Sequence, residues 1–132
     1  MKRKAIPIKS SLDGKRRIAI DDSNAEEILA FLNDKNLTKK FYLICETILL
    51  GLKNTDLYDK EDINSKCKQV TAMKFKSKQN ARLYCKEMKS NDKVLVVIVS
   101  ELLEKKKNQK NQQKEISLIE KVATYEYEIY KK

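Results

Sequence analysis

The sequence predicts an α+β protein, with a small antiparallel sheet, an N-terminal helical hairpin packed on one face of that sheet, and a C-terminal helix. Three features of the hydrophobic pattern support this prediction. Apolar residues recur at helical spacing over 24–34 and again over 38–52. From Gln69 the period changes to two, and residues 93–99 then form a continuous, β-branched run. A last helical pattern covers 116–123.

The start of the chain predicts a β-ribbon. Residues 3–9 and 16–20 favour strands, and Asp13-Gly14 between them is a dipeptide that often closes a hairpin. The length of 132 residues with 41% hydrophobic side chains suits one core, so we expect a single domain over 1–132. In this domain residues 1–22 form an N-terminal strand or ribbon extension.

Two helices are expected next. Ser23 followed by Glu26 is a capping-box pattern at the start of the first helix, and Thr38 can cap the second. The two helices form an α-hairpin that buries its apolar stripe on the strands that follow. The acidic stretch Asp56 to Asp62 is then expected to be a connecting loop.

An antiparallel hairpin with one apolar and one basic face is predicted after Gln69, with its turn at 77–80. The run 93–99 is expected to be the central strand, covered on both sides. After the last helix, Tyr125 and Tyr127 alternate with acidic residues, a pattern that fits either an added strand or a last helical turn. The apolar side chains of this hairpin should face the helices. The opposite face should carry Lys74, Lys76, Arg82, Tyr84 and Lys86.

The charge of the chain predicts a polyanionic partner. The formal net charge is +10 and there is no histidine. Eight Lys or Arg but only one acid, Glu87, lie between Lys66 and Lys89, and like charges this close are costly unless a polyanion neutralises them. A second basic run follows the predicted central strand and comprises Lys105, Lys106, Lys107, Lys110 and Lys114. The alternative is that these lysines only form a solvated, solubilising surface.

Cysteine usage and hydropathy predict a cytoplasmic protein with no membrane partner. The three cysteines form no C-x-x-C pair and are odd in number, which favours a reducing compartment. The longest apolar run, Val94 to Val99, is too short to span a bilayer, and no signal-peptide core follows the basic start. There is no Gly-rich phosphate loop, no Ser/His or Cys/His pair and no zinc-ligand spacing, so we expect no metal and no cofactor.

The basic hairpin also carries a family resemblance. Lys74-Phe75-Lys76, followed after five residues by Arg82-Leu83-Tyr84, resembles the basic strands of RelE-type toxins. The segment Lys106 to Lys110 followed by Glu115-Ile116 is similar to the stretch that leads into the last helix of the HigB branch of this superfamily. The order of elements agrees with the RelE-like fold, although Glu104 stands where the family usually carries an aromatic residue.

The resemblance implies a toxin of a type II toxin–antitoxin system that cleaves mRNA on the ribosome without a metal and so inhibits translation. Arg82 would hold the scissile phosphate, and Lys76 or Lys74 would act in proton transfer. Tyr125 would be a further acid or a base-stacking platform, unless it only packs. The implied RNA-binding residues are Lys78, Tyr84, Lys86, Lys105, Lys106, Lys107 and Lys110.

The partners that this resemblance implies are mRNA, the ribosome and a cognate antitoxin with a helix-turn-helix pattern. Three alternatives remain open at this point. The chain could be a non-catalytic RNA- or DNA-binding protein that uses the same basic face. It could be a relative of the ParE-type toxins, which share the fold but act on gyrase. It could also be a structural or interaction module whose lysines only keep it in solution.

Overall fold

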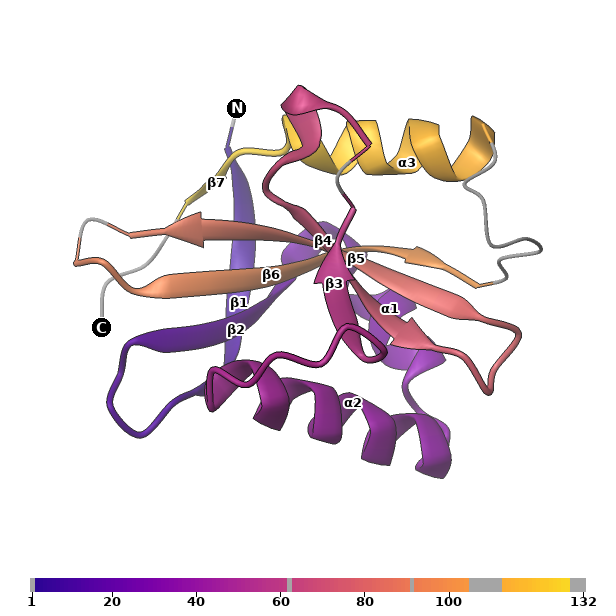
Figure 1. The fold of residues 1–132 in the computed structure, drawn as a ribbon, viewed down its shortest axis with the longest axis horizontal. Coiled ribbons are helices and arrows are strands. Elements are labelled where there is room, and N and C mark those ends of the chain that lie inside the picture. Colours follow the sequence, from indigo (N-terminus) through magenta and orange to yellow (C-terminus); the bar gives the residue numbers. More distant parts are fainter. Residues whose placement is uncertain (1, 62, 91, 105–112, 129–132) are drawn as a thin grey trace.

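A computed structural model describes residues 2–61, 63–90, 92–104 and 113–128. One helix pair lies in the middle of the chain and a third helix near its end (Figure 1). The helical elements are η1 (Asp22–Asn24), α1 (Ala25–Phe31), α2 (Lys35–Leu49), η2 (Ser65–Cys67) and α3 (Gln113–Thr124). The strands are β1 (Arg3–Ser10), β2 (Arg16–Asp21), β3 (Tyr58–Lys60), β4 (Val70–Phe75), β5 (Ala81–Lys89), β6 (Leu95–Leu103) and β7 (Tyr127–Glu128).

These strands form one curled, mixed sheet (Figure 1). Its seven strands have the order β3-β4-β5-β6-β2-β1-β7. The neighbours from β3 to β6 are antiparallel, as are β1 and β2, whereas β2 lies parallel to β6 and β7 lies parallel to β1. The parallel contact between β2 and β6 joins the N-terminal hairpin to the three-stranded meander β4–β5–β6.

The predicted fold class is therefore wrong in two respects. The chain begins with a β-hairpin, not with a helical hairpin, and the sheet is a seven-stranded mixed sheet, not a small antiparallel one. The physical reason is that β2 is a core strand. Ile18 and Ile20 are almost completely buried, and their segment is paired along its length with β6. The segment that the sequence analysis treated as an extension thus belongs to the centre of the sheet.

Several individual elements agree with the prediction. Residues 3–9 and 16–20 do form a hairpin, in which Gly14 adopts a φ of 73° that a glycine reaches without strain. The β4–β5 hairpin is confirmed, and β6, which contains most of the run 93–99, is the fourth of the seven strands. The acidic stretch 56–62 is not only a loop, because it contains the short edge strand β3.

The second helix begins earlier than predicted because a residue that precedes Thr38 in the sequence caps it. Asp34, not Thr38, caps α2: its carboxylate accepts hydrogen bonds from the backbone N–H groups of Asn36 and Leu37. Thr38 instead donates its hydroxyl to the carbonyl of Leu32, at 2.5 Å, and so ties α2 to the end of α1. Within the described part of the chain, no helix has the length and apolar character of a membrane span.

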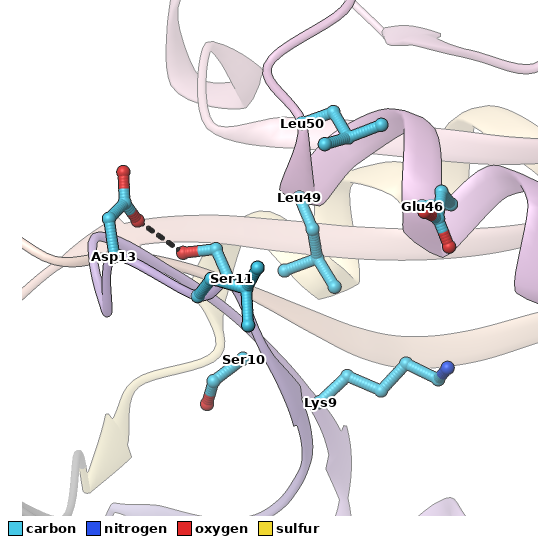
Figure 2. Close-up of a pocket in the computed structure, with 8 residues that line it drawn as sticks. Lys9, Ser10, Ser11, Asp13, Glu46, Leu49 and Leu50 are labelled. Atoms are coloured by element: carbon cyan, nitrogen blue, oxygen red, sulfur yellow. Dashed lines mark hydrogen bonds between the residues drawn. The ribbon is translucent and has the colours of Figure 1, made fainter.

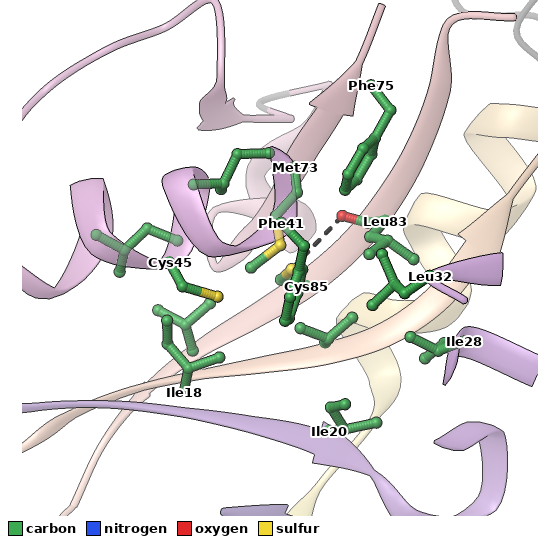
Figure 3. Close-up of a cluster of buried hydrophobic side chains, with 14 of the residues drawn as sticks. Ile18, Ile20, Ile28, Leu32, Phe41, Cys45, Met73, Phe75, Leu83 and Cys85 are labelled. Carbon is green, nitrogen blue, oxygen red and sulfur yellow. Dashed lines mark hydrogen bonds between the residues drawn. The ribbon is translucent and has the colours of Figure 1, made fainter. Parts of the chain in front are cut away.

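Helices cover both faces of the sheet, and each face has its own apolar cluster. On the first face α1 and α2 pack over Ile18, Met73, Phe75, Leu83 and Cys85, several of which Figure 3 labels. On the second face α3 packs through Ile119 and Val122, both fully buried. Figure 1 shows α2 and α3 on opposite sides of the strands. Burial on both faces explains why residues 95–99 of β6 form a continuous apolar run.

Candidate functional site

The register of the β4–β5 hairpin places Lys74, Arg82, Tyr84 and Lys86 on one face, whereas Lys76 follows the end of β4. Lys74 lies directly opposite Arg82, and Ala72 lies opposite Tyr84. Met73, Phe75 and Leu83 alternate with them and face α1 and α2. The predicted two-residue alternation of this hairpin is thus confirmed, with its apolar side toward the helical pair and its polar side away from it.

That polar side, however, is not open to solvent, because α3 lies across it. Tyr84 is fully buried, and the exposed fractions of Arg82 and Lys86 are 8% and 7%. We expected this face to lie opposite the helical layer, and the structure shows a second helical layer over it. The apolar stripe of α3, which contains Ile119 and Val122, needs a surface to cover, and this face of β4, β5 and β6 provides it.

Arg82 and Tyr84 belong to a buried polar cluster under the first turn of α3. Among the described residues, three buried atoms of this region have no hydrogen-bond partner: Nη1 of Arg82, the hydroxyl of Tyr84 and Oε1 of Glu115. Burial lowers the pKa of Arg82, whereas the negative charge of Glu61 raises it. Burial also raises the pKa of Tyr84, and Glu61 raises it further. Buried polar groups usually have partners, so this cluster is a candidate binding site.

Lys86 has a different role, at the other end of α3. Its Nζ donates hydrogen bonds to the carbonyl oxygens of Ala123, at 2.8 Å, and Tyr125, at 2.5 Å. These carbonyls lie at the C-terminal end of α3, where backbone acceptors lack helical partners and a cation is favourable. Burial lowers the pKa of Lys86, and the charge of Glu126 opposes this effect. Lys86 therefore fastens α3 to the sheet in this structure.

Lys74, Lys76 and Lys78 lie at the tip of the hairpin. Lys74 is half-buried and donates to the carbonyl of Thr55, at 2.8 Å. Lys76 is exposed and forms an ion pair with Asp56, at 3.1 Å. Lys78 is exposed in the turn between β4 and β5. The tip thus presents cations to solvent, although two of them already have acceptors from the segment before β3.

Tyr125, the other predicted catalytic residue, is buried at the end of α3. Its hydroxyl donates a hydrogen bond to the carboxylate of Glu101, and the guanidinium of Arg3 lies 3.9 Å from the centre of its ring. Burial raises its pKa, and the hydrogen bond with Glu101 raises it further. Glu101 lies opposite Tyr84 in the sheet, so Tyr125 is close to the buried polar cluster but packs as a core side chain. The predicted residues Lys105, Lys106, Lys107 and Lys110 lie outside the described residues.

A polar network around Asp21 was missed by the sequence analysis. Asp21 is fully buried at the end of β2, and one carboxylate oxygen accepts from Nε of Arg3 and from the hydroxyl of Tyr127, both at 2.6 Å. The other oxygen caps η1. The Tyr127 hydroxyl also contacts Oγ of Ser100, at 2.8 Å. An aspartate directly before a helix start was the available signal, but nothing in the sequence pattern pairs it with the chain ends.

Two surface clefts lie away from these residues, around α2. The first, of about 490 Å³, is shown in Figure 2. It lies between the β1–β2 turn, where Ser11 donates to Asp13, and the end of α2. That hydrogen bond lowers the pKa of Asp13. The second, of about 400 Å³, is lined mainly by apolar side chains, which include Ile8, Leu29, Phe41 and Tyr42. Neither cleft contains a residue that the sequence analysis nominated.

The cysteines and acids do not form a metal site within the residues that the structure describes. No group of three or more potential ligands occurs among them. Cys45, Cys67 and Cys85 are all buried, and burial raises the pKa of Cys45 to about 12. They behave as small core side chains, as Figure 3 shows for Cys45 and Cys85.

The fold and this geometry define a cationic α+β protein with helices on both faces of a mixed sheet and a buried Arg82–Tyr84–Glu115 cluster. No family model, curated protein or solved structure matches the chain.

Proposed function

We propose that this chain is the toxin of a type II toxin–antitoxin system, and that it cleaves mRNA on the ribosome in the cytoplasm. The observation that carries the proposal is the pairing of Lys74 with Arg82 directly across the hairpin, together with the unpartnered Nη1 of Arg82. A guanidinium with a free donor, on a residue that lies opposite a lysine in the hairpin, is suited to hold a phosphate. The family resemblance of the hairpin supports the same assignment.

The chemistry needs three groups. Attack of a ribose 2′-OH on the neighbouring phosphate requires a proton acceptor, stabilisation of the charge on the five-coordinate phosphorus, and a proton donor to the leaving 5′-oxygen. In our proposal Arg82 stabilises the phosphate, and Lys74 or Lys76 takes part in proton transfer. Side chains alone can perform this reaction, and the proposal includes no cofactor.

RNA reaches Arg82 from the tip of the hairpin in this proposal. The pair Lys74 and Arg82 is the last but one before the turn, and the exposed lysines Lys76 and Lys78 lie beyond it. Because Arg82 is only 8% exposed, the contact with a phosphate requires the first turn of α3, around Glu115, to move. The antitoxin is a proposed partner that holds the toxin inactive.

Primer extension on mRNA from expressing cells tests the proposal. Wild-type protein should arrest growth and produce new mRNA ends in phase with codons, and Arg82→Ala should abolish both. Lys15→Ala removes an equal charge from the exposed β1–β2 turn and should leave cleavage unchanged. Circular dichroism of purified Arg82→Ala separates loss of activity from unfolding. Growth arrest with damaged DNA and intact mRNA, as a gyrase poison would cause, contradicts the proposal.

The burial of several predicted catalytic and RNA-binding residues favours a second candidate function, that of a non-catalytic protein that binds RNA or DNA. Arg82, Tyr84, Lys86 and Tyr125 are all less than a tenth exposed, whereas Lys76 and Lys78 are exposed. A protein that only binds would use the exposed lysines through charge, and its affinity would fall steeply with salt. High affinity for RNA without cleavage, even with ribosomes present, would favour this candidate over the toxin.

A further inference from the structure

The segment before β3 contacts the cations at the end of β4. The carbonyl oxygen of Thr55 accepts a hydrogen bond from Nζ of Lys74, at 2.8 Å, and the carboxylate of Asp56 accepts one from Nζ of Lys76, at 3.1 Å. The two acceptors are consecutive residues, and the two donors, separated by one residue, are the last lysine of β4 and the first residue after the strand. Two oxygens from one short segment therefore bind two neighbouring ammonium groups.

The position of this segment follows from the sheet. β3 pairs with β4 in the antiparallel direction, with Tyr58 opposite Met73, so the residues just before β3 lie beside the residues just after Met73. The backbone N–H of Lys74 also donates to the carbonyl of Leu57. The contact of Thr55 and Asp56 with the lysines is thus built into the register of the edge strand.

The charge of a third lysine also acts on this segment. Asp56 is exposed, and its pKa is lowered first by the hydrogen bond and charge of Lys76, and then by the charges of Lys74 and Lys40. Lys40 is a half-buried residue of α2. Two lysines therefore contact the Thr55–Asp56 segment, and the charge of a third, Lys40, also acts on Asp56.

The ligand class follows from the acceptor atoms. A carboxylate oxygen and a carbonyl oxygen bound to adjacent ammonium groups resemble in chemistry the two non-bridging oxygens of a phosphodiester. The pair of Lys76 with Asp56 is weak, because the side chains are 54% and 84% exposed and such surface pairs contribute about 0–1 kcal/mol. A phosphate can therefore displace Asp56 at little cost.

We propose that Lys74 and Lys76 form a binding site for an RNA phosphodiester, to which the charge of Lys40 adds, and that Thr55 and Asp56 occupy this site in the free protein. The choice of RNA as the ligand rests on the proposed function. Asp56 acts as an internal competitor that weakens RNA binding until the phosphate displaces it. This role assigns a function to Asp56 and Lys40, which the pattern of the basic hairpin does not include.

Fluorescence anisotropy with a short labelled single-stranded RNA tests the site, using the full chain at low salt. Asp56→Asn removes the competing charge and should tighten binding about threefold, the factor expected for loss of one exposed ion pair. Glu27→Gln is the matched control, because it removes an equal charge from an exposed position on α1. Tightening by Asp56→Asn that is no larger than that of Glu27→Gln overturns the inference.

Two further variants make the test specific. In a Lys76→Gln background, Asp56→Asn should no longer tighten binding, because the lysine for which Asp56 competes is absent. Lys40→Gln should weaken binding more than Lys39→Gln, which changes the adjacent exposed residue of the same helix. An equal effect of Asp56→Asn in both backgrounds contradicts competition. If the wild-type chain binds no RNA, the proposed function fails together with the inference; if it binds RNA and Asp56→Asn has only the control effect, the inference alone fails.

Discussion

Lys86, from the middle of β5, donates a hydrogen bond to the backbone carbonyl of Ala123 at 2.8 Å, and so closes the C-terminal end of α3 against the sheet. A lysine that the sequence pattern places on an open, RNA-binding face is thereby a helix cap. The same ammonium group also bonds to the carbonyl of Tyr125, at 2.5 Å. One buried cation thus joins the basic hairpin to the helix that covers it.

Replacing Lys86 with methionine should destabilise the protein by about 2 kcal/mol, because two hydrogen bonds from a charged donor are lost while the site of the Tyr125 carbonyl stays buried. Methionine keeps the length and apolar stem of the side chain, so packing changes little. Urea denaturation measures the change. Lys89→Met, an exposed position on the same strand, is the control and should cost less than about 0.5 kcal/mol. Equal effects of the two changes would show that the cap contributes nothing.

Asp21 should be among the most sensitive polar positions of the chain. Asp21→Ala leaves the Arg3 guanidinium without its carboxylate and the Tyr127 hydroxyl with Ser100 as its remaining partner, and it should cost about 3 kcal/mol. Tyr127→Phe removes only one donor from the same carboxylate and should cost about 1 kcal/mol. Chemical denaturation of the two variants gives this ranking. A loss for Asp21→Ala no greater than that for Tyr127→Phe would contradict the proposed network.

Stability should fall at alkaline pH. Burial raises the pKa of Tyr84 and of Tyr127 above the ordinary value of about 10, so the folded state binds more protons than the unfolded state above that pH. The stabilisation is complete below about pH 10 and is lost as the pH rises toward the folded-state values, by up to about 1.4 kcal/mol per pH unit for each tyrosine. Lys86, whose pKa is lowered, opposes this trend, but it is a single group.

Urea unfolding at about pH 8 and about pH 11 measures the alkaline loss. Tyr127→Phe should reduce the difference between the two conditions, because it removes one of the shifted groups. Tyrosinate absorbance should rise together with unfolding for the buried tyrosines. A free energy of unfolding that does not change between the two pH values would contradict the burial of these hydroxyls.

The sequence predicts those parts of the fold that depend on local pattern. The period of two around Met73 and Leu83 gave the β4–β5 hairpin with the correct faces, and the run 93–99 gave the central strand. The parallel pairing of Ile18 with Val97 joins segments that are far apart in the chain. No local feature of either segment identifies the strand with which it pairs. The N-terminal strands were therefore placed outside the sheet to which they belong.

The candidate site shows the same limit. The alternation along β5 indicates that Arg82, Tyr84 and Lys86 share a face. The helical spacing of apolar residues indicates that α3 has an apolar stripe, but neither pattern shows that this stripe covers that face. Tyr84 and Lys86 are buried because α3 packs over the hairpin. This packing is a tertiary contact that the local sequence pattern does not predict. The partners of Lys74 and Lys76 also depend on tertiary structure, since Asp56 reaches them only through the pairing of β3 with β4.

Cleavage of an mRNA on purified ribosomes by the purified chain tests the role of Arg82 most directly. Arg82→Lys keeps the charge and much of the side-chain volume but removes the planar, two-pronged donor. We expect the wild type to cut mRNA at the ribosome in phase with codons, and Arg82→Lys to cut it about 100-fold more slowly. Intact mRNA with the wild type, or equal rates for the two proteins, would contradict this expectation.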